Sequence, residues 1–283
     1  MSRSASCNPK EWSDVMGMTG EKNMAKLVVE KTGTTGRIIF SNEEKMNAMT
    51  LGMWQSLPEA LQQFDRDPDV RVIVLQGAGT RAFVSGADIS EFEHLRNAKE
   101  QQDLYDLAVN EALQAPGECS KPVISSIRGI CIGGGLGLAA ACDLRVCSDQ
   151  SIFRMPAARL GLGYDAQGVK KFVDILGMAN AMEIFVTARK FGAADALRMG
   201  FVSRVCAEHE LDEAVGEFAE MISQNAPLTV RASKFSIKQM VLQSDEQDMA
   251  TAENMVADCF ASDDFKEGRR AFMEKRLPRF QGR

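Results

Sequence analysis

Apolar and polar positions in the first quarter of the chain form a strand-like pattern and then a helical one. Residues 25–31 and 36–42 carry paired β-branched side chains on either side of a glycine-containing turn, which predicts a β-hairpin. Over residues 50–67 apolar side chains recur at helical spacing, and Thr50 stands where an N-cap is expected. The predicted buried face of that helix consists of Met53, Leu57, Ala60, Leu61 and Phe64.

The middle of the chain alternates apolar strands with glycine-rich turns, and the end is mostly helical. Four further strands are predicted, two of the buried type and two short: 70–77, 121–129, 143–148 and 151–155. A longer helix is predicted over residues 98–115, ended by Pro116 and Gly117. After about residue 165 the pattern is helical apart from a short apolar run at 201–205. Strands early and helices late favour an α/β fold with a helical C-terminal portion.

Composition narrows the range of functions. The net charge is −6, so the chain lacks the basic balance expected of a nucleic-acid-binding protein. No apolar run is long enough to span a membrane, and residues 1–24 form a polar extension predicted to be poorly ordered, without the apolar core of a signal peptide. The seven cysteines include no C-x-x-C pair, which argues against a zinc site and favours reduced thiols in a cytoplasmic protein.

Two glycine-bearing stretches stand out as candidate chemistry. Each of FVSGADI (83–89) and CIGGGLGLAAACD (131–143) continues an apolar strand through glycine into a helix. Backbone N–H groups at the N-terminus of a helix stabilise negative charge, and glycine lets a ligand approach them closely. Two such turns could each offer one N–H to the same oxygen, which would make an oxyanion hole from backbone alone.

Four motifs in order resemble the crotonase (enoyl-CoA hydratase/isomerase) superfamily. They are GTRAFVSGADISEF, KPVISSIRGICIGGGLGLAAACDLRV, LGMANAMEIFVTARKFGAADALRMGFVSRV and EGRRAFMEKRLPRF, and the likeness covers about residues 25–283. The resemblance implies a ββα spiral with two sheets over residues 25–209 and a helical trimerisation region over 210–283. It also implies an acyl-CoA thioester as substrate, a homotrimer or hexamer, and no separate cofactor, since coenzyme A is part of the substrate.

The resemblance also assigns site residues. The two oxyanion-hole donors fall on the backbone amides of Ala87 and Gly134. Contacts to coenzyme A or the acyl group fall on Lys45, Met46, Ala48, Ser85, Asp88, Ile89, Gly133, Gly137, Ala157, Phe272 and Lys275. Lys275 matches a lysine that reaches the coenzyme in the neighbouring subunit, and Asp88 is also expected to cap a short helix.

The catalytic acids of a hydratase are missing. The resemblance places two glutamates of that enzyme class at Gly137 and Ala157, where this chain has no carboxylate. Asp165 matches an aspartate of related isomerases, in which a single base moves a proton from C2 to C4 while the oxyanion hole holds the enolate. We therefore expect enoyl-CoA isomerisation with Asp165 as base in an apolar pocket, and weak hydration even if the chain is called a hydratase by family.

Three alternatives remain open at this stage. Tyr164 matches a tyrosine of methylmalonyl-CoA decarboxylases, which makes decarboxylation the rival reaction. Asp165 could instead be only the N-cap of the helix that follows it. A non-catalytic coenzyme A-binding or RNA-binding member is a third reading, and the acidic balance argues against RNA. The only two histidines, His94 and His209, lie in charged stretches and are expected at the surface.

Overall fold

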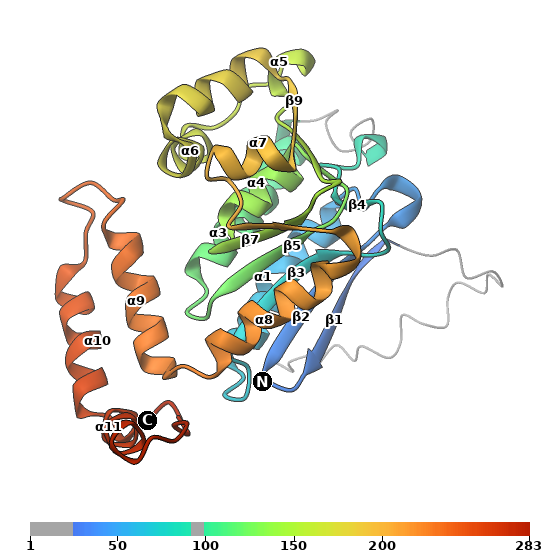
Figure 1. The fold of residues 1–283 in the computed structure, drawn as a ribbon. Coiled ribbons are helices and arrows are strands. Elements are labelled where there is room, and N and C mark those ends of the chain that lie inside the picture. Colours follow the sequence, from blue (N-terminus) through green and yellow to red (C-terminus); the bar gives the residue numbers. More distant parts are fainter. Residues whose placement is uncertain (1–24, 92–98) are drawn as a thin grey trace, which may run out of the picture.

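The computed structural model describes residues 25–91 and 99–283, and its strands form two sheets (Figure 1). The larger sheet has six strands in the order β1-β2-β3-β5-β7-β10, and the smaller has four in the order β4-β6-β8-β9. The strands of the larger sheet are Lys26–Thr32, Thr35–Ser41, Val72–Gly77, Val123–Ile127, Leu144–Ser148 and Arg204–Cys206. Those of the smaller are Ala82–Val84, Ile130–Ile132, Ile152–Arg154 and Lys190–Gly192.

Successive strand pairs divide between the two sheets. β3, β5 and β7 lie parallel in the larger sheet, and the strands that follow them, β4, β6 and β8, lie parallel in the smaller one. A helix follows each pair: α3 (Lys99–Glu118), α4 (Gly134–Ala141), and α5 with α6 (Ala157–Leu160 and Ala166–Thr187). This repeat is the ββα spiral that the family resemblance implies. The predicted hairpin is confirmed as antiparallel β1 and β2.

β3 is apolar at four successive positions, so it buries side chains on both faces of the larger sheet. Ile73 and Leu75 belong to the main core under α1 (Leu51–Arg66), whereas Val72 and Val74 pack with α8 (Leu211–Ser223) on the other face. The predicted N-cap of α1 is confirmed, since the Thr50 side chain accepts from the Met53 amide. All five residues of its predicted buried face are buried, and so is Trp54.

The prediction that a helix ends at Pro116 is wrong, because α3 continues to Glu118. A proline removes its own N–H and crowds the carbonyl four residues earlier, but its own carbonyl can still accept a hydrogen bond. The last carbonyls of α3 find donors in α9 (Pro227–Gln239). Lys234 donates to the carbonyl of Pro116 at 3.1 Å, and Lys238 donates to that of Gly117. These donors lie more than a hundred residues further along the chain, so local helix-stop signals such as proline and glycine could not reveal them.

The remaining C-terminal helices stand apart from the sheets (Figure 1). We call α9, α10 (Met249–Ala261) and α11 (Asp263–Glu274) the C-terminal arm. α8 packs on the larger sheet, although the sequence assigns it to the same region as the arm; the predicted domain boundary at residue 210 stays a prediction. The short helix α7 (Ala193–Arg198) lies near β9 and β10. The predicted extension 1–24 lies outside the described residues.

Candidate functional site

Two glycine turns meet where adjacent strands of the smaller sheet end. One follows β4 at Gly86, whose φ of +114° strains any residue with a side chain, and the other follows β6 at Gly133, with φ +56°. A methyl group built on Gly86 would lie 3.4 Å from the carbonyl oxygen of Ile132 and 3.9 Å from the amide nitrogen of Gly134. The backbones of the two turns are therefore in direct proximity.

The amide of Ala87 is turned away from the neighbouring chain segment. Met49 bridges this residue by donating to the carbonyl of Gly86 and accepting from the amide of Asp88, both at 2.8 Å. In such a pairing the intervening residue directs its own N–H to the opposite side. The Ala87 amide has no hydrogen-bond acceptor among the residues that the structure describes.

Gly134 is the first residue of α4, where an amide has no partner inside the helix. The neighbouring Gly133 amide donates to the carbonyl of Arg154 at 3.0 Å, but within the described part of the chain the Gly134 amide has no acceptor. Both amides thus remain available to a ligand, and the positive end of the α4 dipole stands behind one of them. Each of these amides can therefore donate to an oxygen of a bound ligand.

Close packing fixes the position of α4. A methyl group on Gly135 would lie 2.2 Å from the carbonyl oxygen of Val84, so α4 can approach β4 only with glycine there. A methyl group on Gly134 would lie 3.1 Å from the ring of Trp54. This ring, on α1, packs against the start of α4. The position of the Gly134 amide is therefore set by contacts on two sides.

A buried arginine occupies the opposite end of α4. The Arg145 guanidinium donates to the carbonyls of Cys142 at 2.6 Å and Ala139 at 3.3 Å, and also to that of Phe201. The residue is 8% exposed, and burial lowers the pKa of the guanidinium. A cation at the C-terminus complements the helix dipole, so the short helix carries fixed charge at one end and free amides at the other.

Tyr164 fills the space beside Gly137 in the first turn of α4. Its hydroxyl oxygen would lie 2.8 Å from a methyl group built on Gly137, and its ring packs edge-on against Phe172 and Phe185. Burial, with a smaller effect of Asp165, raises the pKa of this phenol well above its usual value, so the hydroxyl stays protonated. No described residue hydrogen-bonds to the hydroxyl. It is a neutral donor beside Gly137, about one helical turn from Gly134.

Asp165 is the N-cap of α6. One carboxylate oxygen accepts from the Gly168 amide at 2.8 Å, as the capping alternative predicted, and the other has no donor among the described residues. The side chain is exposed in this structure, so the expectation of an apolar pocket around it is not met. Capping uses one oxygen and leaves the second available.

The loop expected to contact coenzyme A is tied to the first glycine turn. Met46 accepts from the Ser85 amide at 3.2 Å, and the Lys45 ammonium contacts Asp88 at 2.7 Å. Burial raises the pKa of Asp88, but hydrogen bonds from Lys45 and Ser90 outweigh it and hold the pKa below its usual value. Asp88 also accepts from the Ser90 amide and begins the short helix Ile89–Glu91, as expected.

The other expected contact residues divide into two groups. Ala48 is buried, Ile89 is 64% exposed, and Ala157 begins α5 without supplying a carboxylate. Phe272 is 82% exposed and Lys275 ends α11, in the arm and away from α4 of the same chain (Figure 1). One subunit therefore does not bring these last two residues to its own glycine turns.

Sequence reasoning missed Asn47, which organises the loop. It is 1% exposed, and its amide group donates to the carbonyls of Ala78 and Ala82 while its oxygen accepts from the Asn42 amide. Its backbone is left-handed, with φ +54°, a conformation that asparagine tolerates. The residue type was the only signal in the sequence, and no turn motif marks the position. Trp54 and Arg145 were missed as well, because their roles depend on tertiary contacts.

The histidines, the cysteines and potential metal ligands are the other side chains with possible chemistry. His209 is exposed, as expected, and His94 lies outside the described residues. No group of potential metal ligands forms among the residues described. The described cysteines are all unpaired, and Cys7 is outside them.

Comparison with known proteins gives a consistent result. The family model described as enoyl-CoA hydratase/isomerase matches residues 30–283. A peroxisomal Δ(3,5)-Δ(2,4)-dienoyl-CoA isomerase of Arabidopsis thaliana is 33% identical, covering 94% of this chain and 99% of its own, and a mitochondrial enoyl-CoA hydratase of Pongo abelii is 31% identical over 92% and 89%. A solved enoyl-CoA hydratase/isomerase family protein from Hyphomonas neptunium superposes with a TM-score of 0.85 at 32% identity, covering 91% of this chain and 98% of its own.

Proposed function

Since the chain belongs to the enoyl-CoA hydratase/isomerase family, we propose that it processes an acyl-CoA thioester through an enolate and shifts the double bond of an enoyl-CoA. The observation that supports this most directly is the pair of amides, Ala87 and Gly134, that have no acceptor among the described residues. The similarity to a dienoyl-CoA isomerase supports the same class of reaction.

The proposed reaction needs one base and one oxyanion site. The thioester oxygen accepts from both amides, Asp165 removes a proton from C2, and the resulting negative charge gathers on that oxygen. The protonated Asp165 then returns the proton to C4, and the double bond moves from C3–C4 to C2–C3. Each such amide is worth about 10²–10³ in rate where it has been removed in other enzymes.

The composition of the site argues against efficient hydration. Adding water across a double bond requires groups that orient and deprotonate the water, and Gly137 and Ala157 supply none. We expect crotonyl-CoA hydration to be weak or absent. Turnover comparable to that of a two-glutamate hydratase would contradict this part of the proposal.

The decisive experiment measures exchange of the C2 proton with deuterated water by mass spectrometry, because exchange reports the enolate whatever the product. Asp165→Asn should abolish exchange, while Asp174→Asn, which removes another carboxylate of α6 from an exposed ion pair with Lys170, should leave it unchanged. Full exchange by the Asp165→Asn variant would eliminate this residue as the base.

Decarboxylation is the second candidate, and the position of Tyr164 favours it. A protonated phenol beside Gly137 can hold an acyl carboxylate while the two amides stabilise the enolate left by loss of CO₂. Release of CO₂ from methylmalonyl-CoA, lost in a Tyr164→Phe variant, would select this reaction. Exchange at C2 without CO₂ release would select isomerisation.

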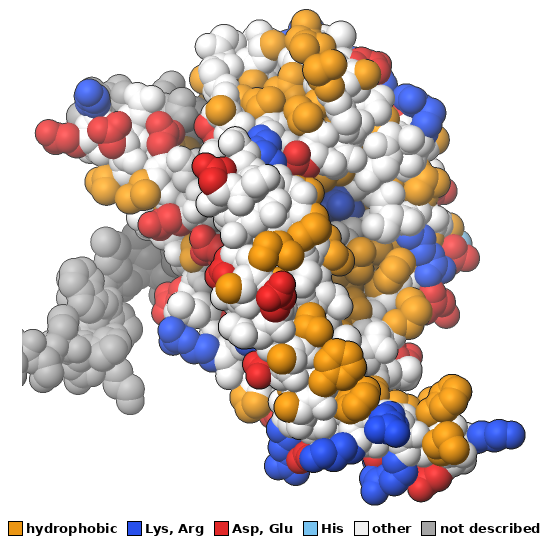
Figure 2. Space-filling model, turned by 90° about the vertical axis from the view of Figure 1, so that its left-hand side faces the viewer, with side chains coloured by type: hydrophobic (Ala, Val, Ile, Leu, Met, Phe, Trp, Pro, Cys, Tyr) orange, Lys and Arg blue, Asp and Glu red, His pale blue; other side chains and the backbone are white. Residues whose placement is uncertain are grey.

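The proposal extends to assembly and cofactor use. A homotrimer or hexamer built through the arm is supported by its exposed apolar side chains, among them Phe260 and Phe272. Figure 2 shows apolar side chains gathered on this side of the molecule. The proposed chemistry uses backbone amides and one carboxylate, and so needs no cofactor beyond the coenzyme A of the substrate. The predicted cytoplasmic location stays a prediction, since relatives carry peroxisomal and mitochondrial names. No described helix has the length and apolarity to cross a bilayer.

A further inference from the structure

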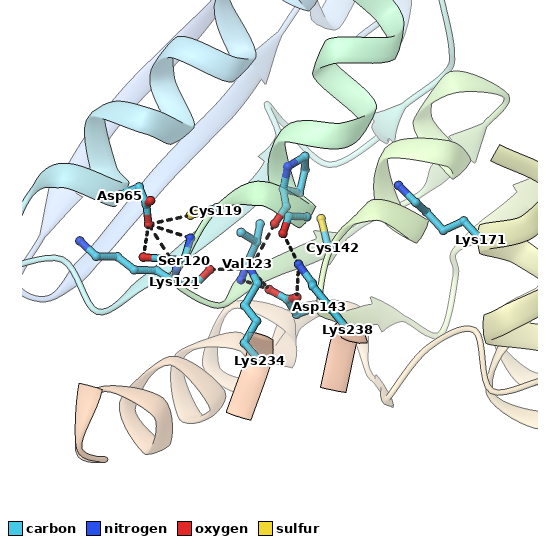
Figure 3. Close-up of polar contacts among 12 residues, drawn as sticks. Asp65, Cys119, Ser120, Lys121, Val123, Cys142, Asp143, Lys171, Lys234 and Lys238 are labelled. Atoms are coloured by element: carbon cyan, nitrogen blue, oxygen red, sulfur yellow. Dashed lines mark hydrogen bonds and ion pairs between the residues drawn. The ribbon is translucent and has the colours of Figure 1, made fainter. Parts of the chain in front are cut away.

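Two lysines of the arm converge on one carboxylate of the core, just past the end of α4 that lies opposite Gly134 (Figure 3). Lys234 and Lys238, one turn apart on α9, place their ammonium groups 2.6 Å and 3.6 Å from the carboxylate of Asp143. Asp143 follows α4 and also accepts from the Val123 amide at 2.7 Å. The two lysines thus join the arm to the end of α4 and the start of β5.

The two ammonium groups differ in how fully they are used. Lys234 is 8% exposed and engages Asp143 as well as the carbonyls of Pro116 and Lys121, which occupies all three of its hydrogens. Lys238 is 34% exposed and donates to the Gly117 carbonyl, with Asp143 at the longer distance. Of these two lysines, Lys238 is the one whose ammonium group is accessible to solvent and has a hydrogen without a close acceptor.

The surroundings of Lys238 disfavour its charged form. Burial lowers its pKa to about 8, with Lys234 adding to this effect and Asp143 opposing it. The charged side chains against it are these two, from α9 itself and from the α4–β7 connection. An unperturbed lysine, with a pKa of about 10.4, is almost fully protonated at pH 7.5. The neutral amine is the nucleophilic form.

A cavity of about 690 Å³ opens beside the Lys238 side chain. Its walls are mainly apolar and include Leu144, Ile222, Val230, Ile237 and Phe280. Asp143, Lys234 and Lys238 also line it. A short acyl chain could lie against the apolar wall with its carbonyl carbon near the Lys238 amine.

We propose that Lys238 is a site of covalent N-acylation by acyl-CoA thioesters. The Lys238 nitrogen attacks the thioester carbonyl carbon, a C–N bond forms, and the C–S bond breaks with its electron pair leaving on sulfur. One proton from the nitrogen passes through Asp143 or water to that sulfur, so the products are an amide and free coenzyme A. No oxidant or further reagent is required.

Acylation would weaken the attachment of the arm. The amide nitrogen carries no charge, so the attraction between Lys238 and Asp143 is lost, and the bulk of the acyl group competes for the space at the Gly117 carbonyl. Lys234 keeps its own bonds. Acyl-CoA supply would in this way modulate how firmly α9 holds the end of α3.

The test incubates the full chain with butyryl-CoA at pH 7.5 and follows each lysine by peptide mass spectrometry. Lys238 should be butyrylated at least about 10-fold faster than Lys266, an exposed lysine of the same arm, because of its larger neutral fraction. Lys234 should stay unmodified in the folded chain. In urea the advantage of Lys238 should disappear.

A Lys238→Arg variant is the matched control, since it keeps the charge and should lose only the label at this position. Labelling of Lys238 at or below the rate of Lys266 in the folded chain would overturn the proposal. The Asp165→Asn variant should be labelled at the same rate as the original chain, because this reaction does not use the enolate site. C2 proton exchange therefore tests the isomerase proposal, and labelling of Lys238 tests this one, so either can fail while the other holds.

Discussion

The glycines at the start of α4 serve different physical needs, although they look alike in the sequence. Gly133 adopts a left-handed backbone, and Gly134 presents its amide. Gly135 allows α4 to touch the backbone of β4, and Gly137 leaves room for the hydroxyl of Tyr164. Only the first two functions relate to the chemistry directly. The other two determine what lies beside it.

Gly135→Ala should destabilise the fold. Its methyl group would meet the Val84 carbonyl oxygen at 2.2 Å, and backbone cannot move aside as a side chain can, so we expect a loss of about 1–3 kcal/mol in the free energy of unfolding or more. Gly216→Ala, on α8 with open space around it, is the control and should stabilise by about 0.5–1 kcal/mol. Urea denaturation measures the unfolding free energy of both variants. Equal changes in the two would show that the contact between Gly135 and Val84 leaves room for a methyl group.

Gly137→Ala tests the position of Tyr164. The added methyl group should displace the phenol and lower the free energy of unfolding by about 1–3 kcal/mol. In a Tyr164→Phe background the clashing oxygen is gone, so most of that loss should vanish. A double-mutant cycle by urea denaturation measures this coupling. Strict additivity would mean that the hydroxyl lies elsewhere in solution.

At the scale of elements, local sequence rules succeeded where an element depends on its own residues. Thr50 caps α1 and the hairpin of β1 and β2 forms as predicted. They failed at the end of α3, because the lysines that satisfy its carbonyls belong to α9. β9 was also missed, since three residues carry too little pattern and gain their pairing from β8.

Lys238 should give the stability a specific pH dependence. Its pKa in the folded chain, about 8, is below the value of about 10.4 expected when unfolded. Between these values the unfolded chain binds more protons, so this lysine makes stability rise with pH from about 8 to 10.4 and contributes no slope well below 8. The difference in unfolding free energy between the original chain and Lys238→Met, measured from pH 7 to 9.5, isolates the effect. A constant difference would contradict it.

Lys234→Met should be far more damaging than a change at an exposed lysine. Removing the ammonium leaves Asp143 without its nearest cation and the carbonyls of Pro116 and Lys121 without their donor. Breaking such a buried pair costs about 3–5 kcal/mol. Lys266→Met, at an exposed pair, should change stability by less than about 1 kcal/mol in thermal or urea unfolding. Similar losses of unfolding free energy in both variants would show that Lys234 does not stabilise the fold through these contacts.

On the scale of the whole molecule, the described chain has a well-covered sheet and a poorly covered arm. Both faces of β3 are buried, one under α1 and one under α8. The arm, in contrast, exposes large apolar side chains and borders an apolar cavity of about 770 Å³ lined by α9, α10 and α11. Exposed apolar area of this kind is typical of an interaction surface.

Phe260→Asp should weaken the proposed assembly. Phe260 is 63% exposed on α10 and packs edge-on against Phe265, so a carboxylate there would be buried unpaired in an interface. We expect the sedimentation velocity of the variant to shift toward that of a monomer at low micromolar concentration. Lys266→Ala on the same arm is the control and should keep the assembly. An unchanged sedimentation profile for Phe260→Asp would place the interface elsewhere.

The sequence by itself determined the first hairpin, the buried face of α1, the two glycine turns and, through four motifs, the family. These features depend on neighbours within a few residues, so short-range pattern contains them. Tertiary structure alone decided that the glycine turns at Gly86 and Gly133 lie side by side, that Tyr164 fills the space at Gly137, and that lysines of α9 cap α3. Such contacts join residues far apart along the chain, and only the packing of whole elements sets their distances.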